Sequence, residues 1–191
     1  MRVSHVTCAV VLFLAASVAP AAANDFKPQL SKYIENATWI QDSVVTSAVE
    51  AQNEKHAGLS DADIEALDQK WRAEKDAGSG PMISEVLAND LSAWLKQKKD
   101  ESNGLIAEVF VMDNKGLNVG QSDPTSDYWQ GDEAKFQQTF GVGPDGQLID
   151  EVEFDDSSES FISQVSRTIT DASGAPIGAV TIGINVELLG G

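Results

Sequence analysis

Two hairpin signals in the C-terminal half constrain the fold of this chain more than any other feature. Each joins two apolar segments through a turn of the pattern D-x-x-G, at residues 113–116 and 171–174. Asp side chains bond to the local backbone in such turns, and Gly adopts the positive φ that closes a bulged hairpin. Before the first turn, residues 105–112 are apolar on both faces and broken only by Glu108, which predicts a central strand.

Five strands are expected from these turns and from the alternation of apolar side chains around them. They cover residues 105–112, 117–121, 148–154, 160–170 and 177–186. Apolar positions 180, 182, 184 and 186 share one face of the last strand, whereas the opposite positions are small or polar. Small residues on that face leave room for a packed helix or a small ligand.

The region before the sheet has helical periodicity. Apolar stripes predict three helices, over residues 26–55, 60–76 and 81–99, with Ser60 as an N-cap and Pro81 in a first turn. A further helix is expected over residues 128–138. The fold class is therefore α+β, in which a helical region, 24–103, packs on a five-stranded antiparallel sheet formed within residues 104–191.

Residues 1–23 have the pattern of a secretory signal peptide. Arg2 precedes an apolar run, and small residues precede the expected cleavage after Ala23. No later apolar run is long enough to span a bilayer, so we expect a protein that is secreted to the periplasm without an anchor. The formal net charge of the chain is −17, which excludes nucleic acid as a partner.

Residues suited to catalysis are scarce. After the signal peptide the chain has one histidine, His56, and no cysteine, and the common metal, phosphate and nucleophile motifs are absent. His56 stands at the end of a predicted helix, where we expect it to complement the helix dipole. We therefore predict that the protein is not an enzyme and carries no cofactor and no metal.

The order of the motifs resembles a known family. A strand ending in D-x-x-G, a predicted helix carrying Tyr128 and Trp129, and the closing hairpin SQVSRTITDASGAPIGAVTIGINVEL together resemble Cache or PDC domains, which are PAS-like sensor domains outside the cytoplasm. The resemblance covers residues 104–188. It implies a small-molecule ligand between the sheet and the helix of residues 128–138, signalling to a membrane sensor kinase or chemoreceptor, and a homodimer formed through the first helix.

The same resemblance implies a ligand site on that helix. Its candidate residues are Tyr128, Trp129, Asp132 and Lys135. Asp127 stands where the family often has an arginine, which argues against a carboxylate ligand. Alternatively, the aromatic side chains are core residues that hold the helix on the sheet, and the protein is an adaptor or structural dimer with a filled core.

Arg167 is the remaining candidate for ligand binding. By strand alternation it shares a face with apolar residues, and a buried arginine needs an anionic partner. That partner is either a ligand carboxylate or an acid of the preceding strand, namely Asp150, Glu151 or Glu153. The acids between residues 145 and 159 could also attract a divalent cation, but their spacing is irregular and favours a solvated face.

Overall fold

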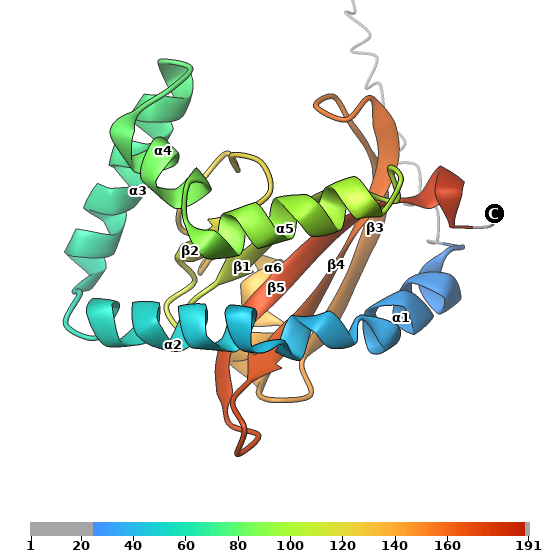
Figure 1. Ribbon diagram of the computed structural model, residues 1–191, viewed down its shortest axis with the longest axis horizontal. Coiled ribbons are helices and arrows are strands. Elements are labelled where there is room, and N and C mark those ends of the chain that lie inside the picture. Colours follow the sequence, from blue (N-terminus) through green and yellow to red (C-terminus); the bar gives the residue numbers. More distant parts are fainter. Residues whose placement is uncertain (1–24, 190–191) are drawn as a thin grey trace, which may run out of the picture.

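The computed structural model describes residues 25–189, so the expected signal peptide, 1–23, lies outside the described residues. Helices come first in this part of the chain and a single five-stranded antiparallel sheet follows, which confirms the predicted fold class (Figure 1). Within residues 25–189, no helix is both long enough and apolar enough to cross a membrane.

The helix predicted over residues 26–55 is two helices. α1 (Lys27–Asn36) and α2 (Ser43–His56) are joined by a 3-10 turn, η1 (Thr38–Gln41), and Asp42 is extended. Residues of modest helix propensity crowd this joint, and the break turns the side chain of Ile40 into the core.

The next predicted helix is confirmed and the one after it is divided. α3 (Asp61–Asp76) begins with a capping box, in which Ser60 and Asp63 satisfy each other's backbone N–H groups. α4 (Pro81–Leu87) and α5 (Asp90–Glu101) are separated at Asn89, whose Oδ1 accepts a hydrogen bond from the Ser92 N–H at 2.7 Å. A residue read as part of one long helix is therefore the N-cap of a second one.

All five strands form one sheet in the order β2-β1-β5-β4-β3, with every neighbouring pair antiparallel. Strand β5 is central, and its register aligns Ile182 with Val109 of β1 and Val165 of β4. The strands are β1 (Ile106–Met112), β2 (Asn118–Gln121), β3 (Gln147–Asp155), β4 (Ser160–Thr170) and β5 (Pro176–Asn185).

Helices α1, α2 and α5 cover one face of the sheet, as Figure 1 shows. The apolar core between these layers contains Leu30, Ile34, Val49, Leu95, Val109, Val165, Val180, Ile182 and Ile184. The opposite face is covered by the short helix α6 (Ala134–Gln137) and the 3-10 turn η2 (Phe140–Val142), where Phe136 packs against Phe110.

A second apolar cluster lies beyond the β2 edge, between α3, α4 and the segment after β2. Its members include Ile64, Trp71, Met82, Ile83, Val86, Leu117 and Tyr128. Figure 1 shows α3 and α4 at the end of the molecule beside β2, away from β3.

The prediction of a helix over residues 128–138 is wrong for most of that range. Only residues 134–137 are α-helical, and Trp129 forms an isolated antiparallel bridge with Leu117. The N–H of Gln130 donates to the Gly116 carbonyl at 2.8 Å, so the segment pairs with the first turn instead of coiling. Trp129, Asp132 and Phe136 consequently do not share a helical face.

Candidate functional site

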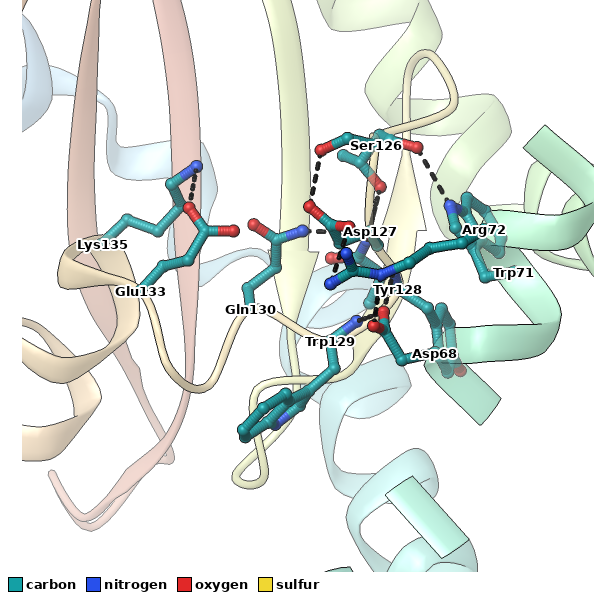
Figure 2. Close-up of polar contacts among 12 residues, drawn as sticks. Asp68, Trp71, Arg72, Ser126, Asp127, Tyr128, Trp129, Gln130, Glu133 and Lys135 are labelled. Atoms are coloured by element: carbon teal, nitrogen blue, oxygen red, sulfur yellow. Dashed lines mark hydrogen bonds and ion pairs between the residues drawn. The ribbon is translucent and has the colours of Figure 1, made fainter. Parts of the chain in front are cut away.

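The extended segment that carries Tyr128 and Trp129 is held by α3. The Oδ1 of Asp68 accepts hydrogen bonds from the backbone N–H of Tyr128 at 2.9 Å and of Trp129 at 3.0 Å. Its Oδ2 accepts from Arg72 Nε at 2.7 Å, and Arg72 Nη2 lies 3.0 Å from Asp127 Oδ1 (Figure 2). Asp68 is buried, so these charge-assisted bonds satisfy a carboxylate that would otherwise oppose folding.

Tyr128 and Trp129 point to different places. The ring of Tyr128 is buried and stacks on Trp71 with ring centroids 5.4 Å apart. Trp129 is half-buried, its Nε1 donates to the Lys115 carbonyl at 2.8 Å, and its ring points away from Asp68 in Figure 2. Trp129 and Asp132 line one pocket of about 700 Å³ on the surface of α3, whereas Tyr128 lines another.

Lys135 lies at a third cavity, between α6 and the sheet, which we name the sheet pocket. Its volume is about 340 Å³. The pocket is lined by Glu108, Glu133, Ala134, Lys135, Asp150, Glu151, Glu153, Phe154, Asp155, Ile162 and Gln164. Six acidic residues and one lysine therefore line a single cavity.

The charges at the sheet pocket are only partly compensated by one another. Lys135 is 14% exposed, its Nζ lies 3.0 Å from Glu133 Oε2, and the same ammonium lies over the Phe110 ring. Glu108 Oε1 accepts a hydrogen bond from Gln164 Nε2 at 2.7 Å. Burial raises the pKa of Glu108, and neither this hydrogen bond nor Lys135 fully offsets the cost of burying its charge.

Arg167 does not have the ion pair predicted for it. In the described part of the chain no carboxylate forms an ion pair with its guanidinium, and Glu151 instead lies 3.2 Å from Lys27 Nζ. The half-buried Arg167 belongs to the helix-covered face of β4, where it opposes Val180 in the register. Its part in ligand binding stays a prediction.

The five candidate residues are thus dispersed and do not form one site. Neighbouring side chains of an extended segment point to opposite sides. Tyr128 therefore points toward the helices, and Trp129 lies at the surface of α3. The acids of residues 145–159 are spread along β3 and the turn after it. Among the residues that the structure describes, no three potential ligands are grouped so as to hold a metal ion.

The sequence analysis missed the partner of His56. This residue ends α2 but is only 7% exposed, and its Nδ1 lies 2.8 Å from Oδ2 of the fully buried Asp113. Asp113 is the first residue of the D-x-x-G turn, 57 positions away in the chain. No local pattern signals this contact, because the pair forms only when α2 packs against the first hairpin.

Comparisons with known proteins yielded similar solved structures only. No family model and no curated protein matches the chain. The isoleucine-bound sensory domain of the Campylobacter jejuni chemoreceptor Tlp3 is 15% identical, with a TM-score of 0.40 over 88% of this chain and 66% of that one. The sensor domain of the V. cholerae histidine kinase DctB is 11% identical, with a TM-score of 0.35 over 86% and 58%.

The E. coli DcuS sensor domain is 16% identical, with a TM-score of 0.38 over 68% of this chain and 96% of that domain. The chain spans less than two thirds of the length of the Tlp3 and DctB domains. Similarity at this level describes an arrangement of helices and strands and assigns no ligand.

Proposed function

We propose that the chain is a sensor module of the periplasm that binds a small molecule with a positively charged group in the sheet pocket. The proposal includes export through the expected signal peptide and signalling to a membrane sensor kinase or chemoreceptor. One observation supports it: six acidic residues and a single lysine line one cavity between α6 and the sheet, and one of the acids, Glu151, is paired with Lys27. A cation entering this cavity would gain from charges that are already held in place.

Glu108 is the central group of this proposal. Its carboxylate comes from the central part of the sheet, and it is oriented by Gln164 while Lys135 is engaged by Glu133. Because burial raises the pKa of Glu108, a ligand cation beside it would replace part of the lost hydration. Ile162 and the exposed ring of Phe154 offer the rest of the ligand an apolar contact, and the ring face attracts cations.

Calorimetric titration with ethanolamine, putrescine and arginine tests the ligand class, with acetate and succinate as matched anions. We expect at least one amine to bind and both acids to fail. Glu108→Gln keeps an acceptor for Gln164 but removes the charge, so it should weaken the amine by about tenfold or more. Glu50→Gln, a change on the exposed side of α2, should have no effect. Binding of the acids alone, or unchanged binding by Glu108→Gln, would contradict the proposal.

The homodimer expected through the first helix stays a prediction. α1 and η1 carry the half-buried aromatic residues Tyr33 and Trp39, which line a surface pocket with Leu105 and Leu188. Sedimentation of the protein with and without a bound amine would show whether two copies associate and whether the ligand alters that association.

A further inference from the structure

The cavity that Tyr128 lines is found among the helices, and the net charge of its lining has the opposite sign to that of the sheet pocket. We name it the helix pocket; it has a volume of about 520 Å³ and is bounded by α2, α3, α4 and the edge of β2. Its apolar wall includes Leu59, Leu67, Met82 and Val86. Such a wall with a few converging polar groups is the usual composition of a small-molecule site.

The hydroxyl of Tyr128 is the first polar group of the helix pocket. Tyr128 is only 5% exposed, and within residues 25–189 its hydroxyl has no hydrogen-bond partner. Burial, and after it the nearby carboxylates of Asp113 and Glu85, raise the pKa of this hydroxyl, so it keeps its proton. The hydroxyl oxygen is not among the fully buried atoms that lack a partner, so it is reached by solvent from the cavity that Tyr128 lines.

His56 is the second polar group, and Asp113 orients it. Asp113 Oδ1 accepts from the backbone N–H groups of Lys115 and Leu117, both at 2.9 Å, while its Oδ2 accepts from Gln52 and lies against His56 Nδ1. The Nδ1 edge of the His56 ring therefore faces the Asp113 carboxylate. No described residue bonds to Nε2, and His56 lines the cavity.

The charges at the mouth of the helix pocket favour an anion. Lys55 and Lys70 line it from α2 and α3, both are exposed, and neither has an ion-pair partner in the part of the chain that is described. Glu85 is the single acid in the lining. Two lysines and one acid give this lining a net positive charge, in a chain whose net charge is −17.

We infer that the helix pocket is a binding site for a small organic anion with an apolar body. The anionic group accepts a hydrogen bond from the Tyr128 hydroxyl beside His56, with Lys55 and Lys70 at the entrance. The apolar body lies against the leucine and methionine side chains of α3 and α4. This inference does not depend on the sheet pocket, which takes a group of the opposite charge.

Titrations with hexanoate, hexanamide and hexylamine test the inference, because the three compounds share one apolar chain and differ in the head group. We expect hexanoate to bind about tenfold more tightly than the other two, since a hydrogen bond to a charged acceptor is the stronger kind. A fourth titration, with hexyl phosphate, shows whether the site prefers a phosphate or a carboxylate. Tighter binding of either anion than of hexanamide supports an anion site. Hexanoate that binds no better than hexanamide would overturn the inference.

The Tyr128→Phe variant locates the site. It removes the hydroxyl and keeps the ring on Trp71, so hexanoate should bind about tenfold more weakly while the melting temperature stays close to that of the parent. Tyr33→Phe, which changes the only other tyrosine of the chain, is the matched control and should bind hexanoate as the parent does. Should Tyr128→Phe lose its fold, Lys70→Met serves instead and should weaken binding less, with a smaller dependence on salt. Unchanged binding by both variants would overturn the inference.

Discussion

The face of the sheet under α1, α2 and α5 and the face under α6 are built from the same strands, but from different side chains. On the first face, β1, β4 and β5 present a layer of valine and isoleucine that is fully buried. On the second face, buried positions include Gln121, Ser166, Thr168 and Thr181, and Glu108 stands beside them. Both faces bury many side chains, yet the first is mostly apolar and the second is mixed.

The two faces therefore have different roles: the apolar face stabilises the fold, and the face with polar groups is suited to binding a ligand. Apolar burial on the helix-covered face supplies folding free energy without any directional requirement. Polar groups on the α6 face need partners, and they find them in pairs such as Ser166 Oγ and Thr181 Oγ1, which lie 2.9 Å apart. A face that already accommodates polar groups can also accommodate a polar ligand, whereas the valine and isoleucine layer cannot.

The largest effect is expected from Ile182→Ala. Ile182 is fully buried at the centre of the helix-covered face, so the substitution leaves a cavity where three strands and the helices meet. We expect a loss of about 2–5 kcal/mol in the free energy of unfolding, measured by chemical denaturation. A loss below about 1 kcal/mol would mean that this face is not the main source of stability.

A smaller effect is expected from Thr181→Val on the opposite face. The substitution keeps the side-chain shape but leaves the buried hydroxyl of Ser166 without its partner, which should cost about 1–3 kcal/mol. Adding Ser166→Ala removes the orphaned group, so the double variant should recover part of the loss in the same denaturation measurement. Equal stabilities of the single and double variants would show that the pair does not contribute.

The smallest effect, and one of opposite sign, is expected from Glu108→Gln without ligand. Burial gives Glu108 a higher pKa in the folded state than in the unfolded state. Such an acid lowers the stability of the fold as the pH rises from the lower of these two pKa values through the higher one. Glu108→Gln should therefore raise the melting temperature at neutral pH. The gain should vanish at a pH low enough to protonate the glutamate in both states. Thermal melts of the parent and the variant at both pH values check the sign, and a lower melting temperature at neutral pH would contradict it.

Local chemistry made much of the fold predictable from the sequence. The D-x-x-G turns and the alternation along the last strands depend on neighbouring residues, and the structure has both hairpins where they were expected. The broken helices were missed because Asn89 could be read either as a helical residue or as a cap. Only its bond to Ser92, together with the bond from its side-chain amide to the Val119 carbonyl, distinguishes the two.

The site was less predictable because its contacts are distant in the chain. The segment of Tyr128 and Trp129 is extended because Asp68, 60 positions earlier, accepts its backbone N–H groups. His56 faces the helix pocket because it meets Asp113 of the first turn. Periodicity within the segment suggested a helix, and no pattern in the sequence announces a hydrogen bond made across two layers of the fold.

The difference between the two faces is tested most directly by an NMR titration of the backbone amides with the amine that binds best. We predict chemical-shift changes at Ile162 and Gln164 of β4 and at Lys135 of α6, with little change along α1 and α2 or around Tyr128. Shifts confined to α1, α2 and the surroundings of Tyr128, or equal shifts in the Glu108→Gln variant, would contradict the account.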